Sequence, residues 1–90
     1  MEIKVGSVVR SRAGHDADDL MFVLALEGER VLLVDGRSRR AENPKRKNPR
    51  HLAVVAEVVP GISERLIAGE KVLAAEIRKT LSALAESDEG

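Results

Sequence analysis

A dense run of basic residues lies between Arg37 and Arg50, and its residue types are those that bind anions. The run, RSRRAENPKRKNPR, holds seven Lys or Arg and one acidic residue, so it carries a charge of +6 in a chain whose formal net charge is zero. Lysine and arginine neutralise phosphates and release condensed counterions, and arginine adds paired donors for phosphate oxygens. The run predicts a polyanion site, and a solvated loop that only aids solubility is the alternative. Its candidate residues are Arg37, Arg39, Arg40, Lys45, Arg46, Lys47 and Arg50.

Phe22 is the only aromatic residue of the chain, and it stands inside an apolar run. Proteins that recognise single-stranded RNA on a sheet stack its bases on exposed aromatic side chains. We therefore expect Phe22 to pack in the core. Any RNA contact should then depend on phosphates, on shape and on stacking by arginine.

Metal binding and catalysis find little support in the residues. His15, Asp16, Asp18 and Asp19 can ligate a divalent ion, but their spacing lacks the glycine and the distant glutamate of a calcium-binding loop. No serine lies in a nucleophile-elbow motif, and the two histidines have no evident orienting partner. The chain also has no cysteine, which excludes disulfides and thiolate sites. We therefore expect no metal, no cofactor and no enzymatic activity.

Length and composition fit a single small domain. The chain has 90 residues, of which 43% are hydrophobic and 33% are charged, a globular balance without room for a second core. No uncharged apolar run approaches the roughly 18 residues that a membrane helix requires, and the start MEIKV is not an apolar signal region. We expect a cytoplasmic protein with no membrane partner.

Short apolar runs predict a mainly β domain over residues 1–60. The expected strands cover residues 5–10, 20–26, 30–35, 38–41 and 51–59, with a hairpin loop at residues 27–29 and a second turn at Asp35-Gly36. Two Asn-Pro pairs bracket the Lys45 to Lys47 run, and proline lacks the amide donor of a central strand, so residues 43–49 should form a surface loop. We expect the strands to curl into a five-stranded barrel. Its expected inner face carries Val8, Phe22, Leu24, Leu32, Val34 and Val54.

A helical period replaces the strand pattern after Pro60-Gly61. Ser63 is the expected cap of a short helix that Gly69 interrupts, and a second helix should run from about Glu70 to Leu84 or Ala85. Leu73, Ile77, Leu81 and Leu84 share one side of that helix, which should pack on the barrel or dock to a partner. We expect residues 61–86 to form a helical C-terminal extension packed on the barrel. Residues 87–90 should be a flexible acidic tail.

The sequence from Gly6 to Leu52 resembles the small bacterial KOW-domain RNA-binding proteins, which are related to KOW-bearing eukaryotic-type ribosomal proteins of the large subunit. The resemblance rests on Gly6, Val8, Val9, Gly14 and the run FVLAL, together with the later stretches VDGR, NPKRKN and RHL. The stretches GEKV and EIRKTL near the C-terminus are also similar. The resemblance implies an SH3-like barrel whose loops contact structured RNA, often ribosomal RNA, with ribosomal proteins as further partners.

Residues that match the family pattern extend the candidate site. The resemblance implies RNA contacts at Arg10, Arg12, Arg37, Arg39, Arg40, Lys45, Arg46, Lys47, Arg50 and His51. One departure is the acidic character of residues 15–19, where the family continues with basic residues and a second glycine. This shifts the expected contact toward residues 37–50.

The leading hypothesis is a non-catalytic RNA-binding module in which basic side chains of neighbouring turns form one continuous surface. The alternative is a protein-interaction adapter, because SH3-like barrels also bind polypeptides and a fold does not determine a function. Its docking surface would be the helical stripe Leu73, Ile77, Leu81 and Leu84.

Overall fold

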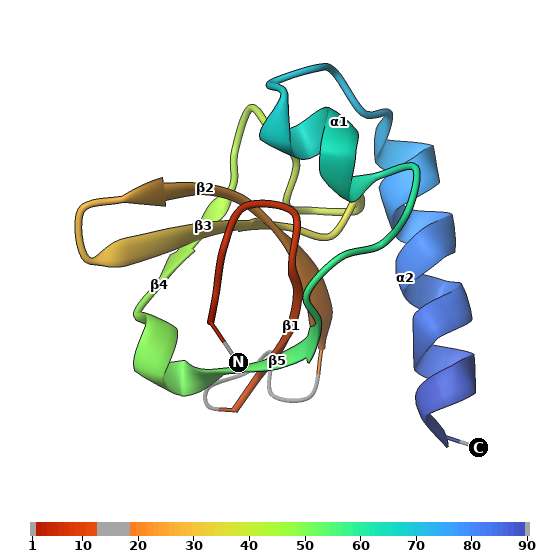
Figure 1. The fold of residues 1–90 in the computed structure, drawn as a ribbon, viewed down its shortest axis with the longest axis horizontal. Coiled ribbons are helices and arrows are strands. Elements are labelled where there is room, and N and C mark those ends of the chain that lie inside the picture. Colours follow the sequence, from red (N-terminus) through yellow and green to blue (C-terminus); the bar gives the residue numbers. More distant parts are fainter. Residues whose placement is uncertain (1, 13–18, 90) are drawn as a thin grey trace.

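The computed structural model describes residues 2–12 and 19–89, which form a curled sheet with two α-helices packed against it (Figure 1). None of the described helices is long and apolar enough to cross a membrane. The elements of the described residues are, in chain order, β1 (Val8–Ser11), β2 (Leu20–Glu27), β3 (Arg30–Val34), β4 (Lys45–Lys47), the 3-10 helix η1 (Pro49–His51), β5 (Leu52–Ala56), α1 (Ser63–Ile67) and α2 (Ala74–Glu89).

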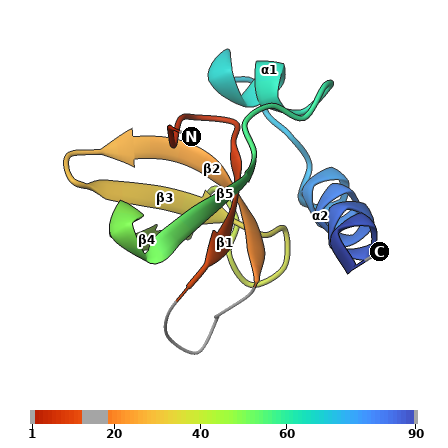
Figure 2. The same ribbon diagram turned by 60° about the horizontal axis from the view of Figure 1, so that its bottom comes forward.

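The five strands of the described residues form one antiparallel sheet in the order β4-β3-β2-β1-β5. The expectation of an antiparallel sheet followed by a C-terminal helix is confirmed. The sheet is open, because β4 and β5 are its two edges. These edges nevertheless approach each other, since Lys47 Nζ on β4 donates to Ser11 Oγ on β1 at 2.8 Å and η1 joins β4 directly to β5 (Figure 2).

The hairpin between β2 and β3 follows the sequence prediction. Glu27 pairs with Arg30, so the turn consists of Gly28 and Glu29. Gly28 has a φ of +60°, a conformation that glycine adopts without the steric cost of a side chain. The local turn residues therefore determine where this hairpin folds back.

The fourth strand lies at a different place from the one predicted. Residues 38–41 form no strand, because Asp35 Oδ1 accepts hydrogen bonds from the amides of Arg37 at 2.8 Å and Arg39 at 3.0 Å and closes a tight turn. The strand is Lys45–Lys47, which had been predicted as part of a surface loop. Pro44 and Pro49 flank this strand, and among the described strands it pairs only with β3, as an edge strand.

Apolar side chains fill both faces of the sheet. One cluster, here the helix-facing core, joins Val8, Phe22 and Val34 to residues of α1 and α2. The other cluster, the inner core, lies on the opposite face, because neighbouring strand residues such as Val8 and Val9 point to opposite sides. The buried residues of the inner core are Val9, Met21, Val23, Val31, Leu33 and Leu52.

The predicted inner face is therefore wrong for most of its members. Val8, Phe22, Leu24 and Val34 pack in the helix-facing core, whereas Val54 packs against the inner core. Leu32 is buried but belongs to neither of these two clusters of described residues. Because both faces of the sheet are covered, β2, β3 and β5 are nearly continuous apolar runs rather than alternating ones. Such a run does not reveal from its pattern which residue faces which side.

Helix α1 begins at Ser63, but Ser63 is not its cap. Ile62 occupies the N-cap position and makes no side-chain hydrogen bond to the helix, and Ser63 is fully buried. The Ser63 hydroxyl donates to the carbonyl of Gly6 and accepts from the amide of Val59, both at 2.7 Å. Ser63 thus ties α1 to the segment that enters β1. Gly69, with a φ of +76°, follows the end of α1, as the sequence predicted.

Helix α2 begins later and ends later than predicted. It starts at Ala74. Glu76 Oε2 accepts a hydrogen bond from the backbone amide of Leu73 at 3.1 Å and so caps the first turn. It continues through Glu89, so residues 87–89, expected in a tail, belong to its last turn. The chain offers no glycine or proline between Ala74 and Gly90 to end it sooner.

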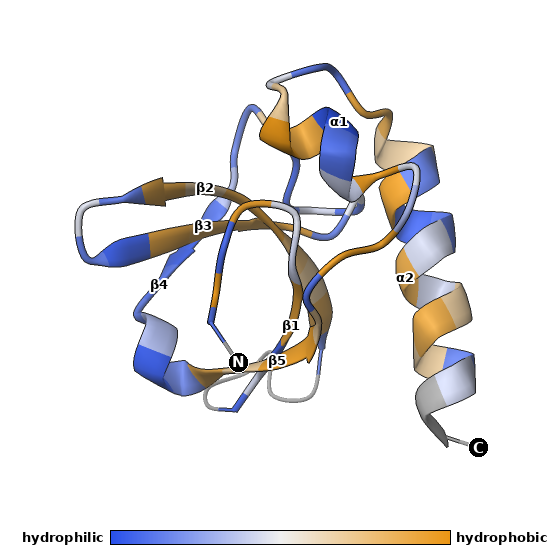
Figure 3. Ribbon diagram, viewed as in Figure 1, coloured by the Kyte–Doolittle hydropathy of each residue, from blue (hydrophilic) through white to orange (hydrophobic). Residues whose placement is uncertain are grey.

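Apolar and hydrophilic residues alternate along α2 (Figure 3), and its apolar side chains pack against the sheet. Ile77 and Leu81 are buried in the helix-facing core, and Leu84 packs against it. Leu73 lies before the helix and is 57% exposed. Most of the predicted stripe is therefore covered by the chain's own sheet.

Candidate nucleic-acid interface

The basic residues predicted from the sequence do not form one continuous surface. They fall into an η1 cluster of four side chains at one end of β3, a turn carrying three arginines at the other end, and three residues within strands. The η1 cluster consists of Arg12, Lys47, Arg50 and His51.

Backbone and side-chain hydrogen bonds hold the η1 cluster together. Asn48 Oδ1 accepts from the amide of Arg50 at 3.0 Å and Pro49 occupies the first turn, so the Asn-Pro pair starts η1 rather than an irregular loop. The amide of Arg12 donates to the carbonyl of His51 at 2.8 Å, which places the end of β1 beside η1. The Lys47 ammonium donates a hydrogen bond to Ser11 Oγ at 2.8 Å, which ties the end of β4 to β1.

The two arginines of the η1 cluster are accessible. Arg12 and Arg50 are exposed, whereas Lys47 and His51 are half-buried. Among residues 2–12 and 19–89, neither arginine forms an ion pair. Asp19 is an acidic residue that lies near Arg12 in the described part of the chain, because its backbone carbonyl accepts a hydrogen bond from the amide of Ser11, the residue before Arg12, at 3.2 Å. Two guanidinium groups are therefore available to an external anion.

Arg46 does not belong to the η1 cluster, because side chains alternate between the two faces of a strand. Lys45 and Lys47 lie opposite Leu33 and Val31, on the face of the inner core, so Arg46 between them points to the other face. There Arg46 Nε lies 3.4 Å from Glu27 Oε1 in an ion pair whose partners are 59% and 60% exposed. Such a pair contributes about 0–1 kcal/mol to stability.

Two further predicted residues lie in strands away from η1. Lys45 is half-buried at the start of β4, opposite Leu33. Arg10 is half-buried in β1, between Leu20 on β2 and Ala53 on β5. Neither belongs to the η1 cluster.

Arg37, Arg39 and Arg40 lie in a turn that packs on helix α2, here the α2-docked turn (residues 35–40). The carbonyl of Gly36 accepts from Arg78 Nη1 at 3.4 Å. Gly36 has a φ of +77°, and a Cβ there would lie 2.9 Å from the amide nitrogen of Arg78. Arg40 Nε donates to the Arg37 carbonyl at 3.0 Å, which orients its guanidinium within the turn. The turn is thus supported by α2, whose contribution sequence reasoning missed.

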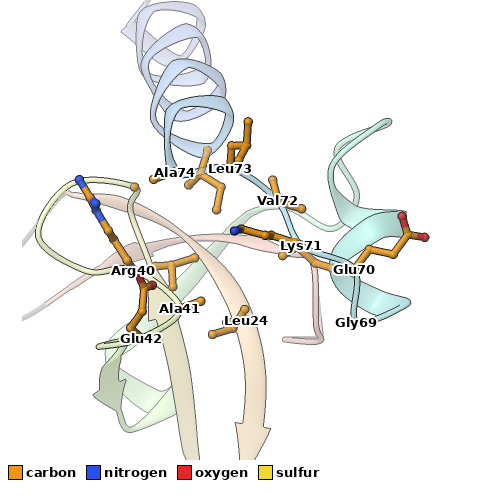
Figure 4. A pocket seen from close by; sticks show the side chains of 14 residues that line it. Leu24, Arg40, Ala41, Glu42, Gly69, Glu70, Lys71, Val72, Leu73 and Ala74 are labelled. Atoms are coloured by element: carbon orange, nitrogen blue, oxygen red, sulfur yellow. The ribbon is translucent and has the colours of Figure 1, made fainter.

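A pocket of about 650 Å³ opens between the α2-docked turn and the connection from α1 to α2 (Figure 4). Its walls include Leu24, Val34, Leu66 and Ile77, and its rim includes charged residues. The pocket is not recognisable in the sequence, because its walls come from segments far apart in the chain. The rim residues that carry charge are Arg40, Glu42, Glu70 and Lys71.

An ion pair fixes the connection beside the pocket. Arg65 on α1 binds Glu76 on α2 through two hydrogen bonds, of 2.8 Å and 3.0 Å, and its Nη2 also donates to the carbonyl of Lys71 at 3.3 Å. The hydrogen bonds from Arg65 and from the Leu73 amide lower the pKa of Glu76 from 4.5 to about 2. The same pairing raises the pKa of Arg65. The Glu76 carboxylate thus caps the start of α2 and links α2 to α1 through Arg65.

Two other predicted features concern base stacking and metal binding. Phe22 is fully buried, as expected, so it offers no face for base stacking. His15, Asp16 and Asp18 lie outside the described residues, and within the described ranges no group of three acidic or histidine residues could hold a metal ion.

Comparison with known proteins finds no family model and no curated protein that matches this chain.

Proposed function

We propose that the chain is a non-catalytic, KOW-like RNA-binding module that contacts structured RNA, ribosomal RNA in particular, in the cytoplasm. The observation that carries the proposal is the η1 cluster, which brings Arg12, Lys47, Arg50 and His51 together from segments distant in sequence. Its two exposed arginines offer planar, paired donors that suit phosphate oxygens.

An SH3-like barrel is the proposed form of the domain. Three features support it: the strand order with β1 between β2 and β5, the single 3-10 turn from β4 to β5, and the inner core enclosed by the curl. The Lys47–Ser11 hydrogen bond spans the side on which the sheet is open. Full closure would require β4 and β5 to approach further.

Phosphate contact is the proposed mode of binding. The chain has no exposed aromatic platform, since its one aromatic side chain is buried. Double-helical RNA is recognised mostly through its backbone and shape, which arginines on a rigid turn can contact without stacking. Structured RNA therefore suits this surface better than an extended single strand.

The helical stripe expected as the docking surface of a protein adapter is mostly covered by the chain's own sheet. Ile77 and Leu81 are buried in the helix-facing core, and Leu84 packs against it. Only Leu73 of that stripe is largely exposed, at 57%. A single exposed leucine supports no helix-in-groove contact, which uses several anchors in succession.

The test is RNA binding by paired variants of equal charge. We expect Arg12→Gln/Arg50→Gln to weaken binding to ribosomal RNA fragments by about tenfold or more, because a hydrogen bond to a charged group contributes about 1.5–3 kcal/mol. The control is Lys4→Gln/Lys79→Gln, which removes the same charge from exposed residues outside the η1 cluster. Fluorescence anisotropy measures both affinities.

Two outcomes would contradict the proposal. The first is that no structured RNA binds at low salt. The second is that both double variants lose the same affinity, since binding would then follow net charge rather than the η1 cluster.

A further inference from the structure

The pocket beside the α2-docked turn has the size of a ligand site. Its volume of about 650 Å³ falls in the range of small-molecule sites, roughly 300–1,000 Å³. Leu24, Ala41, Val72 and Leu73 supply the accessible apolar walls, and the buried Val34, Leu66 and Ile77 lie behind them. Leu24 and Val72 pack against the helix-facing core, so these walls rest on the folded framework.

Both sides of the pocket are held in place by hydrogen bonds. On one side, Asp35 closes the α2-docked turn and Gly36 lies against the backbone of α2. On the other side, Arg65 binds the carbonyl of Lys71, and Glu76 binds the amide of Leu73. The pocket is thus preformed, which lowers the entropy cost of binding a ligand.

The charged rim favours a ligand with an anionic part. Arg40 and Lys71 are exposed, and neither forms an ion pair within the described part of the chain. In Figure 4 the Lys71 side chain reaches in among the lining residues, whereas the Glu70 carboxylate and the Arg40 guanidinium point away from them. Glu42 remains at the rim as an acceptor, and a carboxylate there can bind the exocyclic amine of a base.

We propose that this pocket receives one unpaired nucleotide of the bound RNA. Its base lies against the apolar walls, the adjoining phosphate binds Lys71, and Glu42 accepts a hydrogen bond from a base amine. The inference rests on the proposed RNA-binding function and assigns a substrate class to it, namely structured RNA with a bulged nucleotide. Such splayed bases are the parts of folded RNA that proteins recognise individually.

Strand β4 connects the pocket to the η1 cluster. The segment from Pro44 to Asn48 leads from the rim of the pocket to the start of η1 and spans about 13 Å, at roughly 3.3 Å per residue. An RNA duplex is an A-form helix, and this distance corresponds to a few base steps along it. One RNA helix along the β4 edge can therefore contact both sites.

The test compares two RNA hairpins that differ only in a single bulged nucleotide, with at least four base pairs on each side of it. We expect the full-length protein to bind the bulged hairpin about tenfold more tightly than the fully paired one, which corresponds to about 1.4 kcal/mol. Lys71→Glu should abolish this preference. The matched control Lys79→Glu changes an exposed lysine of α2 that does not line the pocket, and it should retain the preference.

Failure of this inference and failure of the proposed function give different results. Equal affinity for both hairpins, with the effect of Arg12→Gln/Arg50→Gln intact, would overturn the pocket assignment alone. Absence of binding to either hairpin would overturn both. The affinity for free nucleoside monophosphates is measured as well. If they bound as tightly as the bulged hairpin, the pocket would be a site for free nucleotides and the inference would be wrong.

Discussion

Replacement of Gly36 by alanine should separate the α2-docked turn from helix α2. A Cβ at this position would collide with the carbonyl oxygen of Ala74 and lie 2.9 Å from the amide nitrogen of Arg78. These are helix backbone atoms, which cannot rotate away, so the turn and the helix must move apart. A non-glycine residue at a φ of +77° adds about 1–2 kcal/mol, and overpacking typically adds about 1–3 kcal/mol. The expected loss of stability is therefore about 2–5 kcal/mol.

Gly69→Ala is the matched control for this experiment. Its φ of +76° is nearly the same, but a Cβ there meets nothing within 4 Å among the described residues. It should therefore cost only the conformational part, about 1–2 kcal/mol. Urea denaturation followed by circular dichroism measures both changes. If the two variants lost equal stability, the close packing of the turn on α2 would not contribute, and the reasoning would be refuted.

Two further predictions concern the helices. Because the pKa of Glu76 is lowered to about 2 from 4.5, its pairing contributes stability that is present above pH 4.5 and is lost as the pH falls toward 2. Thermal unfolding of the wild type and of Glu76→Gln should therefore differ most near neutral pH and converge in acid, and a difference independent of pH would contradict the role of the Arg65 pair. Ile77→Ala should cost about 2–5 kcal/mol because Ile77 is buried, whereas exposed Leu73→Ala should cost about 0.5 kcal/mol or less, and equal losses would refute the helix packing.

Local residue chemistry was sufficient to predict the β2–β3 hairpin and the end of α1. In both cases a glycine with positive φ lies at the predicted break, at Gly28 and at Gly69. Such signals act over a few residues, so they can be recognised in the sequence. The strand at Lys45–Lys47 could not be predicted this way, because three charged residues between prolines form a strand only through pairing with β3.

The candidate site was predictable in composition but not in arrangement. The charge run identified Lys47 and Arg50, and the family resemblance added Arg12 and His51. Strand alternation then turns Arg46 to the face opposite Lys47, which depends on a strand that the sequence pattern did not predict. The pocket was missed because its walls meet only when the α1–α2 connection folds over the sheet.

The salt dependence of RNA binding tests the central claim most directly. Each phosphate contact contributes about 0.7–0.9 to the slope of log affinity against log salt, so loss of Arg12 and Arg50 together should reduce that slope by about 1.4–1.8. Lys4→Gln/Lys79→Gln should leave the slope unchanged. If the Arg12→Gln/Arg50→Gln variant kept the slope of the wild type, the η1 cluster would not contact phosphates and the account would be contradicted.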